Sequence, residues 1–404
     1  MAQLLIRGLE QLATPFGIAA PLRGRALGDV DVIEDAYVLC DGDTVVECGR
    51  MRDLRDLGDV EVLDARGWCA VPGLVDCHTH PAFGGDRVNE FSLRAGGASY
   101  EELHAAGGGI LSTVQATRSL GEDGLRAAVE RHAGWMLRHG TTTWEGKSGY
   151  GLDRETELAS LRAIGAAGGV PTWLGAHAVP PEFDDADAYL AFLLAEVLPA
   201  AAQLAEAADV FLERGAFDVD QARLYLDACH AEGLALRLHG DQFTESGAIP
   251  LAIELDVRSI DHLEATGHEG VQALAKSDVV GVLLPASALF LGRPMPPARA
   301  LVDAGAAVAL ATDFNPGSSF TTSLPLVCSL ASTQLKLSPS EALGAVTVNA
   351  AHVLGCADRV GRIAAGYRAD VVLLDAPDWR YLAYGLAGDI VAAVVRGGEL
   401  AYRR

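Results

Sequence analysis

Short apolar runs alternate with amphipathic stretches through the middle of this 404-residue chain. The stretches repeat apolar residues at helical spacing, while the runs have the length of buried strands. Eight such runs occur, at residues 71–78, 140–146, 170–177, 208–214, 234–239, 258–262, 279–285 and 306–313. Eight strands separated by helices predict an α/β fold, a parallel (β/α)8 TIM-like barrel.

The two ends of the chain have a different texture. Residues 1–68 contain short β-like runs broken by Gly and Asp, and the chain from about residue 360 repeats this pattern. Neither end is long enough for a good core of its own, so we expect one small β-sandwich built from both. The predicted domains are 1–68 plus 360–404, and a barrel over 69–359.

The net charge of −23 limits the partners of such a protein. Without a basic stripe the chain cannot neutralise phosphates, so nucleic acid and anionic membrane surfaces are not expected partners. A small anionic substrate would need locally placed cationic groups. The seven cysteines form no C-x-x-C pair, and no apolar run resembles a signal or membrane segment. We therefore expect reduced cysteines and a cytoplasmic location.

The interval between the first two predicted strands spans about 60 residues. Barrel loops of this length commonly serve the active site. The run Gly107-Gly108-Gly109 within it is typical of a flexible joint and equally typical of a helix-capping turn, and the sequence leaves both open.

Polar side chains stand where several of these strands end. His78 and His80 follow the first run, and residues two apart on a strand point to the same face. His239, His262 and Asp313 close three later runs, and active-site residues of a barrel come from those strand ends. An H-x-H pair alone is as often a pair of surface or core histidines as a metal site.

Three imidazoles and a carboxylate suit Zn²⁺ or Fe²⁺, with one coordination position left open for water. We predict that His78, His80, His239 and Asp313 hold one divalent metal ion per subunit. The fourth strand, VFLERGAF, ends without a lysine that could be carbamylated and bridge two ions. One metal is therefore expected rather than two.

Longer motifs accompany these residues, in the order GLVDCHTHPAFGGDRVNEF, GGGILSTV, KSGYGL, LGAHAVPPEF, LHGDQ, DHLE and ATDFNPGSS. Together they resemble the amidohydrolase superfamily and, more closely, its imidazolonepropionase family. The resemblance implies a metal-dependent hydrolase of histidine degradation. The implied reaction is the third step of histidine degradation, which opens the cyclic amide 4-imidazolone-5-propanoate to N-formimidoyl-L-glutamate. A metal-bound hydroxide would attack the lactam carbonyl.

The resemblance also implies how the substrate is held. Arg87 would clamp the propionate with its two-pronged guanidinium, although a surface ion pair with Asp86 or Glu90 is the alternative. Tyr150 would give its hydroxyl to the ligand while its ring packs on the imidazolone. Without the KSGYG motif, Tyr150 would be an ordinary loop aromatic.

Further site residues follow from the other motifs. His177 would polarise the carbonyl oxygen, with a core histidine as the alternative. Gln242 would face the ring nitrogens of the substrate. The turn that contains Asn315, Gly317 and Ser318 would hold the amino-acid-like end of the product through its backbone groups.

Gln242 departs from some relatives, which place a carboxylate there. Because an amide cannot act as a base, the proton transfer is assigned to Asp313, with His262 as the second group. Gly240 also stands where alanine is usual. The stretch 244–255, TESGAIPLAIEL, departs from the glycine-rich pattern that is usual in the family. How the far end of the substrate is held therefore stays open.

Two other functions compete with this interpretation. A deaminase or deiminase of a guanidine-like or aryl amine would use the same metal ligands but would not need Arg87 for a propionate. A catalytically inactive scaffold would be expected to lack at least one ligand, and none is missing. The expected partner is a small substrate with a carboxylate, and a homodimer remains open.

Overall fold

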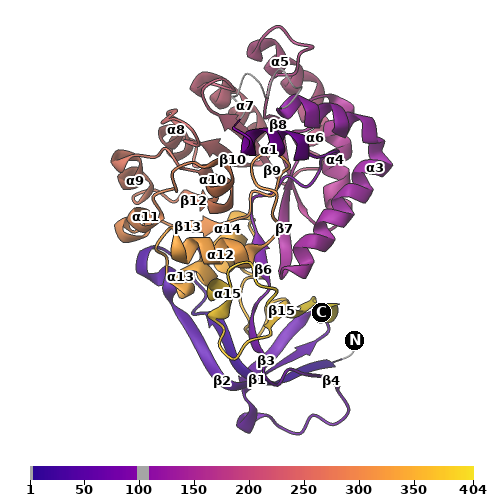
Figure 1. Cartoon of the computed structure of the whole chain (residues 1–404), viewed down its shortest axis with the longest axis vertical. Coiled ribbons are helices and arrows are strands. Elements are labelled where there is room, and N and C mark those ends of the chain that lie inside the picture. The colour runs from indigo at the N-terminus through magenta and orange to yellow at the C-terminus, as the bar shows by residue number, and fades with distance from the viewer. Residues whose placement is uncertain (1–2, 98–108) are drawn as a thin grey trace.

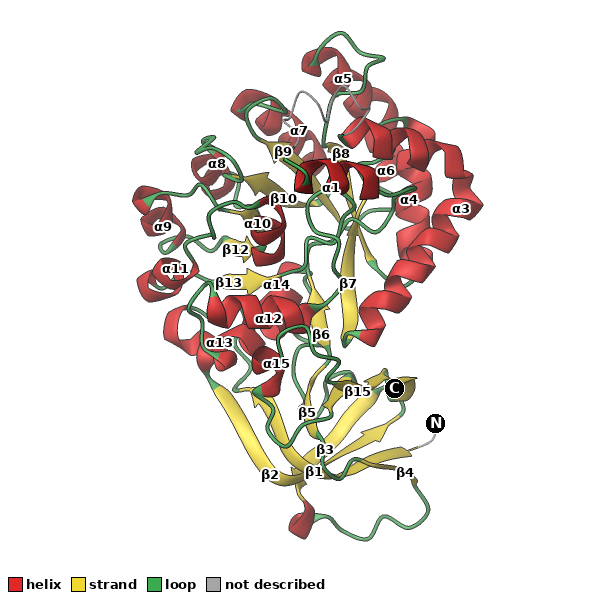
Figure 2. Ribbon diagram, viewed as in Figure 1, coloured by secondary structure: helices red, strands yellow, loops and turns green. Residues whose placement is uncertain are grey.

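The computed structural model describes residues 3–97 and 109–404, which form two eight-stranded sheets. One sheet is a barrel surrounded by helices, and the other is a helix-poor sheet at one end of the molecule, where both termini lie (Figure 1). Figure 2 shows the contrast, with helices covering the outside of the barrel strands and almost none on the second sheet. The fold class predicted from the sequence is confirmed.

The barrel strands follow one another in chain order and are all parallel. They are β6 (Leu74–Asp76), β7 (Thr141–Lys147), β8 (Val170–Ala176), β9 (Ala207–Leu212), β10 (Ala235–Gly240), β11 (Ser259–His262), β12 (Val280–Leu283) and β13 (Val308–Leu310). The chain segments after β6 and β13 join by backbone bonds, His80 N to Phe314 O at 2.8 Å and Asp313 N to His78 O at 3.0 Å. These bonds bring the first and last strands together at their carboxyl ends.

The second sheet combines both ends of the chain. Its order is β16-β15-β14-β5-β1-β2-β3, with β4 on the other half of β1. The strands are β1 (Gln3–Pro15), β2 (Val30–Asp41), β3 (Thr44–Arg50), β4 (Glu61–Asp64), β5 (Cys69–Pro72), β14 (Val371–Leu374), β15 (Val391–Arg396) and β16 (Glu399–Arg403).

The predicted strand 71–78 needs a correction. Cys69–Pro72 pairs with β1 and β14 of the terminal sheet, and only Leu74–Asp76 enters the barrel. The two strands separate at Gly73, whose N–H donates to Asp370 O at 2.9 Å. One continuous apolar run therefore serves two sheets, so residues 69–72 lie in the terminal sheet. The rest of the proposed domain division stays a prediction.

Helices cover the barrel between consecutive strands, three more follow its last strand, and the last helix lies between two strands of the terminal sheet. Their bounds are α1 (Val88–Ala95), α3 (Ile110–Arg138), α4 (Arg154–Ala166), α5 (Ala186–Phe192), α6 (Leu198–Ala201), α7 (Val219–Ala231), α8 (Ala248–Glu254), α9 (His268–Leu274), α10 (Pro285–Leu291), α11 (Ala298–Ala304), α12 (Leu324–Thr333), α13 (Pro339–Gly344), α14 (Ala350–Val353) and α15 (Tyr381–Tyr384). Helix α7 illustrates the sequence logic. Asp218 and Gln221 form a capping box at its start, and its buried residues recur at helical spacing, Ala222, Tyr225, Leu226 and Cys229.

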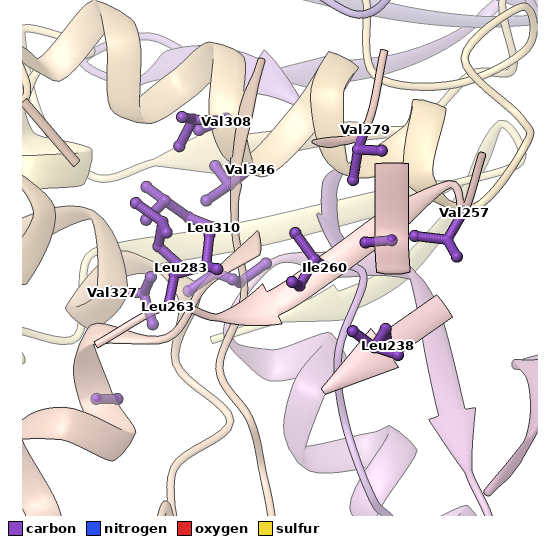
Figure 3. Packing of buried hydrophobic residues seen from close by; sticks show 14 of the residues in the cluster. Leu238, Val257, Ile260, Leu263, Val279, Leu283, Val308, Leu310, Val327 and Val346 are labelled. Carbon is purple, nitrogen blue, oxygen red and sulfur yellow. The ribbon is translucent and has the colours of Figure 1, made fainter. Parts of the chain in front are cut away.

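The alternation of side chains along the strands separates an apolar layer from a polar one. Leu238, Ile260 and Leu310 pack with Val327 and Val346 in the layer between strands and helices (Figure 3). Their strand neighbours point the other way, into the barrel. These inward residues include Arg237, His239 and Asp261, all buried. The barrel interior is therefore polar at the level of the predicted ligands.

Two further expectations meet the described residues only in part. Gly107 and Gly108 of the predicted joint lie outside them, and Gly109, at φ 93°, immediately precedes α3. None of the helices in residues 3–97 and 109–404 has the length and apolarity needed to cross a membrane.

The junction at Gly73 predicts a stability defect. A methyl group on Gly73 would lie 2.7 Å from Asp370 Cβ and closer still to Thr142 Oγ1. We expect Gly73→Ala to destabilise the protein by about 1–3 kcal/mol, because it overpacks a buried strand junction. Thermal unfolding measures this, with Gly165→Ala as the control, since a methyl group there meets only Pro171 Cγ at 3.6 Å. Equal midpoints for the two variants would contradict the prediction.

Candidate active site

A cavity of about 350 Å³ opens at the carboxyl ends of the barrel strands. Its lining contains nearly all the predicted site residues: His80, Arg87, Tyr150, His177, His239, Gln242, His262, Asp313, Asn315, Gly317 and Ser318. His78 is fully buried beneath it. A larger hollow of about 640 Å³ lies beside α5 and α7 and carries none of these residues. The chemistry therefore belongs to the smaller cavity.

The four predicted metal ligands converge at the floor of this cavity. The Nε2 atoms of His78 and His80 lie 3.2 Å apart, and Asp313 Oδ1 is 3.5 and 3.4 Å from them. The ring of His239 is centred 4.4 Å from that of His78, and its Nε2 is buried without a hydrogen-bond partner in the described chain. The ligand atoms of His78, His80 and Asp313 are close enough to share one ion, and His239 joins them through His78. Such a set of imidazoles and a carboxylate suits a cation.

The connected charges beneath the ligands also favour a cation. Lys147 and Arg237 contribute two positive charges, whereas Glu145, Asp209, Asp261 and Asp313 contribute four negative charges. With His78 neutral, as a metal ligand must be, these six buried side chains carry a surplus of two negative charges that water screens poorly. One divalent ion would balance it.

The protonation equilibria agree with this electrostatic picture. Burial alone would raise the pKa of Asp313, but the imidazoles of His78 and His80 hold it well below its usual range. Burial and Lys147 lower the pKa of His78, yet its bonds to Asp261 and Asp313 prevail and raise it to about 9. Burial lowers the pKa of His80 and His239. The site thus keeps the Asp313 carboxylate ionised and the rings of His80 and His239 neutral, which is the protonation state that metal ligands need.

His262 lies on the other side of His78. With His78 and His239 it forms a second group of nitrogens close enough to share an ion, and its own Nδ1 is 3.4 Å from Glu264. Its φ is 88°, and Asp313 has φ 51°. Left-handed conformations are uncommon outside glycine, although Asp and His adopt them more readily than most residues, and they cluster at functional sites.

Arg87 has features of both alternatives predicted for it, the carboxylate clamp and the ion pair. Its Nη1 is 3.5 Å from Glu90, but its side chain is only 13% exposed, and it lines the cavity. Nε donates to Thr113 Oγ1 at 3.0 Å. The guanidinium rests on Gly317, where a β-carbon would meet Nη1 at 2.9 Å. Arg87 is thus a half-anchored cation facing the cavity rather than a surface ion pair.

His177 adopts a tautomer that limits its chemistry. Its Nδ1 lies 2.9 Å from Gly149 O, which can only accept, so Nδ1 carries the proton. Burial and His239 lower the pKa of His177 to about 4. The neutral ring therefore offers a lone pair at Nε2, and donation to a carbonyl oxygen, the predicted role, would need a second proton on this ring. Tyr150 is buried too, and burial raises its pKa, which keeps its hydroxyl a donor.

The turn after Asp313 is bonded within itself. Asn315 Oδ1 accepts from both Gly317 N and Ser318 N at 2.8 Å, and Asn315 Nδ2 donates to Asp313 Oδ1 at 3.0 Å. The backbone groups expected to hold the product are therefore engaged. Asn315 instead orients the Asp313 carboxylate, and the Ser318 hydroxyl accepts from Asn315 Nδ2 at 2.8 Å and lies 3.4 Å from Asp313 Oδ2.

Comparison with known proteins agrees with this geometry. The model of the amidohydrolase family matches residues 69–401. The chain belongs to the amidohydrolase family. Imidazolonepropionases from Rubrobacter xylanophilus and Solibacter usitatus are 62% and 45% identical to it, covering 98% and 100% of both chains. The resemblance drawn from the motifs is confirmed, and the chain groups with the imidazolonepropionases.

Solved amidohydrolase structures share the fold at low identity. A triazine hydrolase variant has a TM-score of 0.75 at 19% identity, covering 99% of this chain and 95% of that chain. Guanine deaminase from E. coli has a TM-score of 0.70 at 15% identity, covering both chains completely. At these identities the likeness supports the architecture alone.

The charged layer beneath the ligands of this amidohydrolase was not predicted from the sequence. Asp209 and Asp261 lie within predicted apolar strands, Lys147 directly follows another, and both aspartates bond to Lys147 across the barrel. Ionisable residues are almost never fully buried unless paired. An aspartate inside a predicted buried strand, or a lysine at its end, was therefore the available signal.

The ligand geometry predicts the effect of removing each donor. We expect His78→Ala, His80→Ala, His239→Ala and Asp313→Ala each to lower the bound metal per subunit, because a site with four donors has none to spare. Elemental analysis of purified protein measures this. His230→Ala is the control, since that histidine is exposed in the last turn of α7. A variant with full metal content would remove that residue from the ligand set.

Proposed function

We propose that this protein hydrolyses 4-imidazolone-5-propanoate to N-formimidoyl-L-glutamate in the degradation of histidine. The observation that carries the proposal is the pairing, within one cavity, of the histidine–aspartate cluster with the inward-facing Arg87. The cluster suits hydrolysis of an amide, and Arg87 suits a substrate with a carboxylate. Relatives named imidazolonepropionase, aligned over the full chain, support this choice.

We further propose that His78, His80, His239 and Asp313 hold one divalent ion, Zn²⁺ or Fe²⁺. When bound, such an ion supplies a Lewis acid that lowers the pKa of water and polarises a carbonyl oxygen. An adenosine deaminase of the same fold from Xanthomonas campestris was solved with bound zinc. The ammonium of Lys147 is engaged with carboxylates, which disfavours a carbamate and a second ion.

The chain's own residues would orient the substrate. Arg87 receives the propionate, and Tyr150 donates its hydroxyl to the ligand. His177, with its lone pair at Nε2, accepts from a ring N–H instead of polarising the carbonyl. The side-chain amide of Gln242 makes no hydrogen bond within residues 3–97 and 109–404, so it can pair with the remaining ring nitrogen.

The proton transfers fall to Asp313. A water oxygen adds to the lactam carbonyl carbon, and Asp313, ionised in the resting site, accepts the proton that the water loses. The carbon–nitrogen bond then breaks, and Asp313 returns the proton to the departing nitrogen. His262 assists Asp313 in these proton transfers. Gln242 takes no part because an amide has no accessible protonation change.

We also propose a cytoplasmic location for this protein. All seven cysteines are free, and all but Cys48 are buried, which suits a reducing cytoplasm. The homodimer stays a prediction.

The assignment of the base gives a direct test. We expect Asp313→Asn to reduce kcat by about three orders of magnitude, near the upper end of what general base catalysis supplies, whereas Gln242→Glu keeps substantial activity with an altered pH profile. Metal content must be measured beside kcat in both variants. If metal-loaded Asp313→Asn turned over within about tenfold of the parent while Gln242→Ala were inactive, the base would lie after His239 instead.

The carboxylate clamp gives a second test through Gly317. A methyl group on Gly317 would push against the Arg87 guanidinium, a flexible group, so Gly317→Ala should raise KM with little loss of stability. Arg87→Lys should also raise KM more than it lowers kcat, because an ammonium lacks the fork. Gly134→Ala, where a methyl group meets open space, is the control. Unchanged KM values in both variants would favour a substrate without the carboxylate, as for a deaminase.

A further inference from the structure

Lys147 occupies an unusual position, fully buried at the end of β7 and inside the barrel. Its Nζ lies 2.6 Å from Asp209 Oδ2, 3.0 Å from Glu145 Oε2 and 3.7 Å from Asp261 Oδ2. These carboxylates come from three strands, β9, β7 and β11. A single ammonium therefore ties three strands of the barrel together beneath the cavity.

Two of these carboxylates also hold metal-ligand histidines. Asp261 Oδ2 lies 2.6 Å from His78 Nδ1, and Asp209 Oδ2 lies 2.8 Å from His239 Nδ1. Asp209 Oδ1 further accepts from the backbone N–H of His239 at 3.2 Å. The oxygens that contact Lys147 are thus the ones that face the two imidazoles.

The contact to His78 is a hydrogen bond, whereas the contact to His239 is an ion pair at 2.8 Å that lacks hydrogen-bond alignment. A carboxylate beside Nδ1 favours the proton on that nitrogen, which leaves the lone pair on Nε2, directed at the proposed metal position. His80 differs, because the carboxylate beside it in the described chain, Asp313, lies at its Nε2 and not at its Nδ1. The pairing is therefore specific to His78 and His239 rather than common to every histidine of the site.

The two aspartates need a shared cation to stay in place. Both are fully buried, and the desolvation of two neighbouring carboxylates is offset only by a well-placed positive charge. Three ion pairs and the absence of solvent leave the ammonium little freedom. Removing it would release both carboxylates and, with them, the orientation of both imidazoles.

We propose that Lys147 is a positioning residue of the metal site, which holds Asp209 and Asp261 so that His239 and His78 present Nε2 to the ion. This inference rests on the ligand set proposed above. Lys147 touches neither the substrate nor the ion on this account. Its role is to fix two ligands at once from one point.

Arg237 provides a matched control. It is an equally buried cation on β10, and it pairs with Glu145 while donating to Cys77 O at 3.3 Å and Val353 O at 3.0 Å. Within the part of the chain that the structure describes, it forms no ion pair with Asp209 or Asp261. Arg237→Met therefore removes a buried charge from the same cluster without releasing either histidine partner.

The test measures metal affinity rather than turnover. Metal-free parent, Lys147→Met and Arg237→Met proteins are titrated with Zn²⁺ against a chromophoric chelator, and the absorption spectrum of each Co²⁺ form is recorded. We expect Lys147→Met to bind Zn²⁺ about 10–100-fold more weakly than the parent and to change the Co²⁺ spectrum. Arg237→Met should keep the parental affinity and spectrum, although it also loses thermal stability. Equal affinities in Lys147→Met and Arg237→Met would overturn the proposal.

The isosteric variants Asp209→Asn and Asp261→Asn keep the test decisive if Lys147→Met does not fold. Each should weaken Zn²⁺ binding about tenfold or more, and parental affinity in both would overturn the proposal. Where Lys147→Met folds, adding it to the double aspartate variant should cause no further loss, because its effect passes through these carboxylates. A parent protein that binds no Zn²⁺ would instead refute the proposed metal site itself.

Discussion

Two backbone hydrogen bonds, between His80 N and Phe314 O and between Asp313 N and His78 O, join the first and last strands of the barrel. They decide where the chemistry of this protein can occur, because they bring residues from opposite ends of the barrel sequence into one site. His78 and His80 then face Asp313 across the closure. His239 and His262 arrive from strands further round the barrel, whose parallel order directs every carboxyl end to the same side.

Burying the polar layer below this closure costs desolvation free energy, so a gain in stability does not explain why the layer is present. Glu145, Lys147, Asp209, Arg237 and Asp261 are buried, and buried ion pairs are often no more stabilising than apolar residues of the same volume. Removing one partner is nevertheless costly, since the others are left uncompensated. Burying these charges and removing any one of them both cost free energy, which suggests that the layer has a function. Its position directly under two histidines proposed as metal ligands indicates that this function is to position them.

The substrate pocket depends on loops that lie far apart in the sequence. The Arg87 guanidinium packs on Gly317. The side-chain amide of Asn315 bonds to Gly317 N within the turn and to the carboxylate of Asp313, which it orients. A net charge of −23 would repel an anionic substrate at a distance, so recognition must be local. The partly buried guanidinium of Arg87, whose direction is set by its contacts to Glu90 and Thr113, is the group we propose for that recognition.

The sequence by itself determined the barrel and the terminal sheet and led to the proposed ligand set, because these depend on short-range signals: strand and helix periodicity, turn residues, and histidines or aspartates at strand ends. It did not reveal that the run 71–78 divides at Gly73, since both halves are equally apolar and only the pairing partners differ. The engagement of the Gly317 and Ser318 backbone was likewise undetermined. Only the turn geometry shows it.

Tertiary structure alone also decided the tautomer of His177 and the role open to Lys147. Each depends on a partner remote in sequence, Gly149 O for His177 and Asp209 or Asp261 for Lys147. A hydrogen bond to a carbonyl fixes which ring nitrogen carries the proton, and a buried ammonium is explained only by the carboxylates around it. Local sequence specifies which groups are present. The closed barrel determines which of them meet, and that meeting sets their chemistry.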